Sequence, residues 1–205
     1  MPSGEKARVA RRGDIPAITE TISLAFHTDP TWSWAFPDEA RRQEHYGVYW
    51  RFLIEGAMRF ERPAVFVTDD IEAAAIWLPP GERELSAEDE ERVPDVLREL
   101  IGERVDEVME LLERFEAAQP ADPPHYYLSL LGVHDDHRGK GIGMRLLREN
   151  LERFDAESVP SYLESSNAGN DHRYESLGYR RIGEFTTPDD AVTIAAYWRD
   201  AAQPA

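Results

Sequence analysis

The chain has 205 residues, of which 41% are hydrophobic and 31% are charged, and it contains no cysteine. This composition allows a packed core and excludes disulfide bonds, thiolate metal sites and cysteine nucleophiles. The net charge of -17 argues against a nucleic-acid partner, and no stretch approaches the roughly 18 consecutive apolar residues of a membrane span.

The first part of the chain alternates between short apolar runs and stretches with helical spacing of apolar residues. Acidic or hydroxyl residues at the starts of the helical stretches, Asp14 and Ser86 among them, predict N-caps. The predicted elements, in order, are a strand over 7–10, a helix over 14–27, a loop or broken helix over 27–40, a helix over 38–60, strands over 64–68 and 72–78, and helices over 86–118 divided near Gly102.

The second part continues the alternation after a proline-rich connector over 120–124. The predicted elements are a strand over 126–133, a glycine-rich turn, a helix with Met144, Leu147, Leu151 and Phe154 on one face, a strand over 161–165, a short helix over 170–177 capped by Asn170, and strands over 179–185 and 191–198. This order predicts an α/β (α+β) fold in which a mixed sheet has helices on both faces.

The glycine-rich turn is the segment with the clearest chemistry. It reads Arg138-Gly139-Lys140-Gly141-Ile142-Gly143 and leads directly into a helix. Alternate glycines allow positive φ and close approach of main-chain N–H groups to a ligand, and a helix N-terminus attracts anions. The same segment carries a local cluster of cations in an acidic chain. A tight turn with glycines for steric reasons only is the alternative, and the spacing matches neither a P-loop nor a dinucleotide fingerprint.

The pattern R-x-x-G-x-G at 138–143 resembles the pyrophosphate loop of the GNAT superfamily of acyl-CoA-dependent N-acetyltransferases. A second stretch, with Asn170, Tyr174, Gly178 and Tyr179, is similar to the other half of that superfamily's signature. The layout is also loosely similar to that of puromycin N-acetyltransferase relatives. The resemblance implies a GNAT-like, mostly antiparallel twisted sheet in a single domain over 1–205, with an acceptor-side half (1–124) and an acyl-CoA-binding half (125–205).

The resemblance also implies roles for individual residues, with acetyl-CoA as co-substrate and no metal. Tyr174 would act as general acid, and Glu164 is the leading candidate for the base, with His27, Asp29 and His125 as rivals. Asp29 and Trp34 fall where the acceptor pocket is usually built. The residues implied in binding coenzyme A are Leu131, Gly132, Val133, Arg138, Gly139, Lys140, Gly141, Ile142, Gly143, Met144 and Asn170.

Each of these assignments has a structural alternative. Tyr174 can be a packed helix aromatic, Asn170 an N-cap, and Glu164 a paired or solvent-facing strand residue. Trp34 and the aromatic residues near it can belong to the core.

The function implied is transfer of acetyl from acetyl-CoA to a primary amine of a small molecule by direct attack. The alternatives are a non-catalytic acyl-CoA-binding regulatory module, a protein N-terminal or lysine acetyltransferase, and transfer of a longer acyl group. The beginning of the chain has no apolar signal segment, so we expect a cytoplasmic protein, monomeric or homodimeric, without membrane or nucleic-acid partners. The acidic charge favours basic partners, although it can also serve solubility alone.

Overall fold

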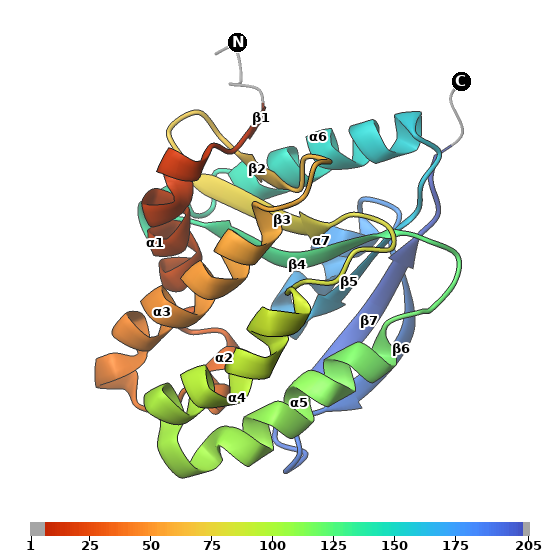
Figure 1. The fold of residues 1–205 in the computed structure, drawn as a ribbon. Helices are drawn as coiled ribbons and strands as arrows, with labels where there is room; N and C mark the ends of the chain where they lie inside the picture. Colours follow the sequence, from red (N-terminus) through yellow and green to blue (C-terminus); the bar gives the residue numbers. More distant parts are fainter. Residues whose placement is uncertain (1–6, 203–205) are drawn as a thin grey trace.

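The computed structural model describes residues 7–202, in which seven strands form one sheet in the order β1-β2-β3-β4-β5-β7-β6 (Figure 1). All neighbouring strands are antiparallel except β4 and β5. This arrangement confirms the predicted mixed, mostly antiparallel sheet. The strands are β1 (Arg8–Val9), β2 (Val65–Val67), β3 (Ala73–Leu78), β4 (Tyr126–Val133), β5 (Ser161–Ser165), β6 (Arg180–Thr186) and β7 (Thr193–Arg199).

Helices cover both faces of the sheet (Figure 1). In Figure 1, α1, α3, α4 and α5 lie on the near face, whereas α6 and α7 lie behind the sheet. In residues 7–202, no helix combines the length and apolar composition needed to cross a bilayer. The helices are α1 (Ile15–Phe26), α2 (Pro30–Ala35), α3 (Glu39–Ala57), α4 (Ala87–Ile101), α5 (Val105–Ala118), α6 (Ile142–Ala156) and α7 (Asp171–Glu175).

Two of the predicted helix caps are wrong. The Asp14 carboxylate does not cap α1; it accepts from the main-chain N–H of Arg11 (2.8 Å) and from the guanidinium of Arg8 (2.6 Å). Asn170 occupies the N-cap position of α7, but its Oδ1 accepts from Arg173 at 3.1 Å and makes no capping bond. In both cases a nearby arginine competes successfully with the helix N–H groups for the side-chain oxygen.

The break between α4 and α5 is confirmed. Ser86 caps α4 by accepting from the N–H of Asp89 at 3.1 Å. Gly102 ends that helix with φ of 62°, a value that favours glycine, and α5 begins after one 3-10 turn. The chain therefore changes direction between α4 and α5. This turn places α5 beside β6, at the edge of the sheet (Figure 1).

Strand β3 divides the core into two clusters. Ala74 and Ile76 pack with α1 and α3, whereas Ala73, Ala75 and Trp77 pack with α6. Because side chains alternate along a strand, a strand buried on both faces has an apolar residue at each position. The predicted apolar run over 72–78 has this property from Ala73 onwards.

Strand β4 contains a bulge at Ser129. Ile76 of β3 pairs with Leu130 and Trp77 pairs with Leu128, so Ser129 is the extra residue between them. Leu128 consequently packs on the α6 side, and Leu130 packs on the α1 and α3 side, although an unbroken strand would place them on the same face. The bulge therefore changes which face each following residue of β4 presents.

Gly132 lies where β4 passes beneath α1, and we expect Gly132→Ala to destabilise the protein. An added Cβ would lie 2.8 Å from both the Cβ of Ala25 and the Cδ1 of Ile22. Overpacking of this kind typically costs about 1–3 kcal/mol in free energy of unfolding. Urea denaturation of the variant should show this loss, and Gly13→Ala is the control because an added Cβ there meets nothing within 4 Å. Equal stability of the two variants would contradict the close packing.

Candidate active site

The sheet opens where β4 and β5 stop pairing. Leu128 opposite Leu163 is the last pair between these parallel strands. Strand β4 then continues as Ser129–Val133, and β5 continues with Glu164 and Ser165, without further pairs between them. The divergence leaves one side of the second half of β4 without a strand partner among the residues that the structure describes. An extended ligand can pair with a strand edge of this kind.

A cavity of about 1030 Å³ occupies the region where the two strands diverge. This volume suits a ligand as large as a cofactor, because small-molecule sites are typically about 300–1,000 Å³. Its wall is formed by β4, the end of α1, the glycine-rich turn, the start of α6, and α7 at one end. Residues of α3, α4, α5 and the segment after β3 form the other end, which we call the acceptor end.

The glycine-rich turn presents main-chain N–H groups to the cavity. Gly139 and Gly141 have φ of 76° and 73°, and Gly141 is the N-cap residue of α6. The carbonyl of Gly141 accepts from the N–H of Arg145 at 3.0 Å, so the N–H groups of residues 142–144 have no acceptor within the helix. Together with the helix dipole, these groups make a site for a phosphate or pyrophosphate.

Gly143 has a packing role in addition to the main-chain N–H that its spacing predicted for binding. It lies inside α6 and not in the turn, and an added Cβ would lie 2.8 Å from the Cγ2 of Val133. Its missing side chain therefore allows the first turn of α6 to pack against the end of β4, next to the unpaired strand edge.

The structure brings together most of the residues implied in binding coenzyme A. Lys140 is the exception, since it does not line the cavity and its Nζ donates to the carbonyl of Asp136 at 3.1 Å. The residues that do line the cavity are Leu131, Gly132, Val133, Arg138, Gly139, Gly141, Ile142, Gly143, Met144 and Asn170.

Arg138 lines the cavity and also forms hydrogen bonds with α1. Its guanidinium donates to the carbonyls of Leu24 (3.0 Å) and Ala25 (2.9 Å) at the end of α1, and pairs with Asp135 at 2.7 Å. The side chain thus fixes the turn against α1, and the main-chain N–H groups of the turn are the more accessible donors for an anion.

Glu164 lies immediately after the last β4–β5 pair, at the base of the divergence. Its Oε1 is buried and has no hydrogen-bond partner in the described part of the chain. Burial raises the pKa of this carboxyl from 4.5 to about 8; hydrogen bonding with the hydroxyls of Tyr162 and Tyr127 opposes the shift, and the nearby Glu84 adds to it. A carboxyl with a pKa close to neutrality can take up and release protons during a reaction.

Tyr174 projects from α7 into the same cavity and packs near Tyr179 and Tyr197. Burial raises the pKa of its hydroxyl to about 12, and the charge of Asp29 adds to the shift. The hydroxyl therefore stays protonated at neutral pH and is available as a hydrogen-bond donor.

Asp29 is 7% exposed and lines the cavity as well as capping α2. Its Oδ1 accepts from the N–H groups of Thr31 and Trp32, both at 3.1 Å, and its Oδ2 accepts from the hydroxyl of Ser166 at 2.6 Å. Burial raises its pKa to about 6. The carboxylate thus holds α2 to the segment after β5, and a role in contacting a substrate stays a prediction.

Trp34 lies outside the cavity wall. Its indole N–H donates to Asp189 at 2.8 Å, and the guanidinium of Arg104 lies 4.7 Å from its ring. Trp32 faces the cavity instead. Two residues that are two positions apart on a helix point in nearly opposite directions, so only one of the two tryptophans can face the site.

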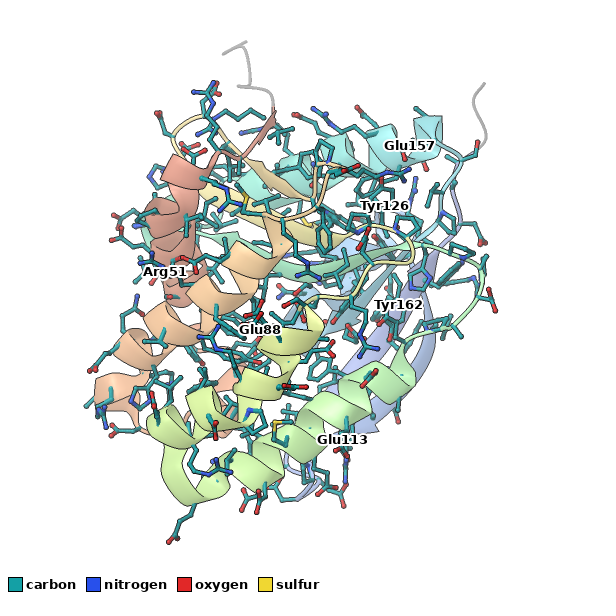
Figure 2. The ribbon with its side chains drawn as sticks, in the orientation of Figure 1. Arg51, Glu88, Glu113, Tyr126, Glu157 and Tyr162 are labelled. Carbon is teal, nitrogen blue, oxygen red and sulfur yellow. The ribbon has the colours of Figure 1, made fainter. Side chains whose placement is uncertain are left out.

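The rival bases His27 and His125 do not line the cavity either. His125 is buried between Tyr162 and Trp198, and its Nδ1 lies 2.8 Å from the carbonyl of Pro123. Figure 2 shows that Tyr162 points from the sheet towards α5, where its hydroxyl donates to the carbonyl of Ala118 at 3.2 Å.

Glu84 is a cavity residue that the sequence does not indicate. It belongs to the segment between β3 and α4, and its Oε1 accepts from the hydroxyl of Ser129, the bulged residue of β4. Burial raises the pKa of its carboxyl. Glu84 and Glu164 therefore lie on either side of the point where the sheet opens, with the side chain of Tyr127 influenced by both charges.

Metal coordination has no candidate in residues 7–202, since no group of three or more His, Cys, Asp or Glu side chains is suitably placed. The site offers several carboxyl groups, the phenol of Tyr174 and a row of main-chain N–H groups.

Residues 31–179 match the family model described as the acetyltransferase (GNAT) family. The matched region includes the glycine-rich turn, β5 and α7, and therefore most of the cavity wall.

Solved structures with the same fold cover nearly the whole chain. A Corynebacterium glutamicum protein described as histone acetyltransferase HPA2 and related acetyltransferase is 23% identical, with a TM-score of 0.70 and 98% of each chain covered. The polyamine N-acetyltransferase of Drosophila melanogaster is 16% identical, with a TM-score of 0.64 over 95% of this chain and 98% of that one. The ribosomal-protein-S18-alanine N-acetyltransferase of Escherichia coli is 16% identical, with a TM-score of 0.54 over 98% and 96%. The names of these proteins differ in the acceptor, so the shared fold does not define one.

Proposed function

Because this chain belongs to the GNAT acetyltransferase family, we propose that it transfers acetyl from acetyl-CoA to a primary amine of a small molecule. The observation that carries the proposal is the position of Glu164 and Tyr174. Both line one cavity with the glycine-rich turn, and the two side chains differ in the proton chemistry they can perform.

The residues present fit coenzyme A. The N–H groups at the start of α6 suit a pyrophosphate, and the unpaired edge of Ser129–Val133 suits the amide groups of an extended pantetheine arm. Acetyl-CoA supplies the acetyl group as a thioester. The main-chain N–H near Val133 is the proposed donor to the thioester oxygen, where negative charge develops during attack.

Glu164 is the proposed base. An aliphatic amine arrives mostly as ammonium, and its nitrogen has no lone pair for attack until one proton leaves. The Glu164 carboxylate takes that proton, directly or through one water, and then releases it to solvent. The amine nitrogen bonds to the acetyl carbon and the carbon–sulfur bond breaks. The nitrogen loses its second proton, and the departing sulfur gains one, so the products are an amide and a thiol, with one net proton released through Glu164.

Tyr174 is the proposed partner of the departing sulfur. A phenol with a pKa of about 12 is a weaker acid than a thiol, whose pKa is about 8.5. Complete transfer of the phenolic proton to free thiolate is therefore unfavourable. We expect Tyr174 to donate a hydrogen bond to the sulfur as charge develops there, while the sulfur receives its proton at the end of the reaction.

A small acceptor is favoured over a protein because α4 and α5 wall the acceptor end of the cavity. The test is thiol release from acetyl-CoA across a panel of small amines, with acceptor peptides assayed by mass spectrometry and acetyl-CoA binding by calorimetry. Thiol release with small amines supports the proposal. Acetyl-CoA binding without release from any amine would instead indicate a non-catalytic module, and acetylation of peptides alone would indicate a protein acetyltransferase.

Replacing Tyr174 by Phe should lower kcat about 10- to 100-fold and change the Kd for coenzyme A by less than about threefold. The reason is that the hydroxyl acts on the developing charge at sulfur and contributes little to ground-state binding. Steady-state kinetics with a good amine acceptor and calorimetry with coenzyme A check the two halves of this prediction. An unchanged kcat would remove Tyr174 from the reaction, and a large loss of affinity would make it a binding residue.

A further inference from the structure

Most of the carboxyl groups that line the cavity lie at the end opposite to the cations of the glycine-rich turn and α7. The end formed by the glycine-rich turn and α7 carries the cations Arg138 and Arg173, with the buried carboxyl of Asp29 nearby. The acceptor end carries five glutamates, namely Glu82, Glu84, Glu90, Glu113 and Glu116, and one cation, Arg83. This separation matches an anionic ligand at one end and suggests a cationic ligand at the other.

The single arginine of the acceptor end does not neutralise it. Arg83 lies 2.8 Å from Glu90 and 3.6 Å from Glu116. Glu84 and Glu113 have no ion pair with any residue of the described chain within 4.0 Å. The charge of Arg59 acts on Glu84, but the Arg59 guanidinium donates to the main-chain carbonyls of residues 83 and 84 and forms no ion pair with the carboxyl.

An independent observation points to a ligand at the same place. Glu164 lines the cavity, and its buried Oε1 has no hydrogen-bond partner within residues 7–202, although the hydroxyls of Tyr162 and Tyr127 lie close enough to the carboxyl to lower its pKa. A buried polar atom without a partner is costly, and an ammonium group brings three donors that can satisfy it. Glu164 and Glu84 thus offer two separate carboxyl groups to a ligand that lies where the sheet opens.

Aromatic side chains form the wall near these carboxyls. Trp32 stacks on Phe115 with ring centroids 6.0 Å apart and an interplanar angle of 13°, and its ring lies edge-on to Trp50 at 4.7 Å. Tyr49 completes this group at 6.0 Å from Trp32. Aromatic faces accommodate methylene groups and attract organic cations. The acceptor end therefore suits an alkyl chain with positive charge better than a neutral or anionic molecule.

We propose that the acceptor carries a second positive charge, as in an α,ω-diamine, a polyamine or a guanidinoalkylamine, and that Glu84 binds this charge while the reacting amine lies beside Glu164. The inference rests on the proposed function, since it names the class of amine that the enzyme acetylates. Glu82 and Glu113 add to the negative potential around the second charge.

The experiment compares matched acceptors. Propylamine, butylamine and pentylamine are assayed beside the α,ω-diamines of the same chain lengths, with an aminoalkylguanidine to distinguish ammonium from guanidinium as the second cation. The best diamine or guanidine should exceed its matched monoamine in kcat/KM by at least about tenfold, the effect of roughly 1.4 kcal/mol from one partly buried ion pair. Equal kcat/KM values for monoamines and dications would overturn the inference and leave the proposed function intact. Absence of thiol release with every amine would overturn the proposed function instead.

Variants of Glu84 and of a control residue test whether Glu84 causes the preference for dications. Glu84→Gln should lower kcat/KM about tenfold more for dications than for their matched monoamines, chiefly through KM, with both proteins assayed at about pH 9 because Glu84 also influences the pKa of Glu164. Glu88→Gln is the matched control, because Glu88 is exposed on α4 and does not line the cavity (Figure 2). Glu113→Gln, at an exposed position of α5, should cause a smaller loss of about two- to fivefold with the same selectivity and serves if Glu84→Gln does not fold.

A binding measurement completes the test without turnover. With coenzyme A bound, the best dication should raise the Tm of the wild-type protein more than its matched monoamine does. Glu84→Gln should remove this difference, and Glu88→Gln should keep it. An undiminished difference in Glu84→Gln would show that Glu84 does not bind the second charge.

Discussion

Glu164→Gln should lower kcat/KM for an amine acceptor about 10²- to 10³-fold, the usual contribution of a positioned general base. The substitution keeps the shape of the side chain and removes its ability to accept a proton. Steady-state kinetics at saturating acetyl-CoA measure the loss, with Glu152→Gln, an exposed position of α6, as the control. Retention of full activity would assign the base role to another group, of which Asp29 is the first candidate within the cavity.

The pH dependence of the same reaction gives a second readout. Because the pKa of Glu164 is raised to about 8, only a minority of the free enzyme carries the ionised base at pH 7. Wild-type kcat/KM should therefore rise with pH and level off above about 8, and Glu164→Gln should lose this limb. A purely structural role for Glu164 would lower activity without changing the shape of the profile.

As the pH rises, we expect the contribution of Glu164 to the free energy of unfolding to fall while activity increases. Between pH 4.5 and about 8 the folded protein holds a proton on Glu164 that the unfolded chain has released, so this group makes stability fall as pH rises through that window. Below pH 4.5 the carboxyl is protonated in both the folded and the unfolded state, so its ionisation no longer affects the free energy of unfolding. Glu164→Gln should therefore be more stable than wild type at pH 8, by about 2–4 kcal/mol, and the two proteins should converge near pH 4.5. Urea denaturation at several pH values measures the difference.

Gly141→Glu should weaken binding of coenzyme A at least about 100-fold, through repulsion of the pyrophosphate and loss of the αL conformation that the turn requires. Gly141 has φ of 73° and precedes the free N–H groups of α6, so a side chain there stands at the place proposed for the anion. Calorimetry with coenzyme A measures the affinity.

The control for Gly141→Glu separates strain from charge. Gly81→Glu introduces the same side chain at a glycine with φ of 80°, also with open space around its Cβ position, outside the cavity wall. We expect that variant to lose some stability and to bind coenzyme A with wild-type affinity. Tight binding by Gly141→Glu would place the pyrophosphate elsewhere.

The elements and motifs were predictable where the determining interactions are local. Apolar spacing and the positions of proline and glycine define the strands and helices. Gly139 and Gly141 indicate the positive φ angles of the glycine-rich turn. The two helix caps failed because Arg8 and Arg173 reach Asp14 and Asn170, and competition between side chains is not visible in a capping pattern.

The acceptor end was not predictable for a related reason. Glu84 is one of 40 acidic residues in the chain, and it is distinguished by its place in the cavity wall and its bond to Ser129, neither of which the sequence shows. That bond depends on the bulge in β4, which arises from pairing with β3 and leaves no mark in the sequence around Ser129. The sequence likewise does not show whether Trp32 or Trp34 faces the cavity, because the orientation of α2 decides it.

Helices α4 and α5 leave the sheet after β3 and return to it at β4, and these two strands are neighbours. The whole excursion can therefore change in length or composition without altering the order of the strands. All five glutamates of the acceptor end, and the aromatic ring of Phe115, come from this single segment between β3 and β4. If these glutamates select the amine as we propose, exchanging residues 79–125 between relatives should change the acceptor preference without altering the glycine-rich turn or α6.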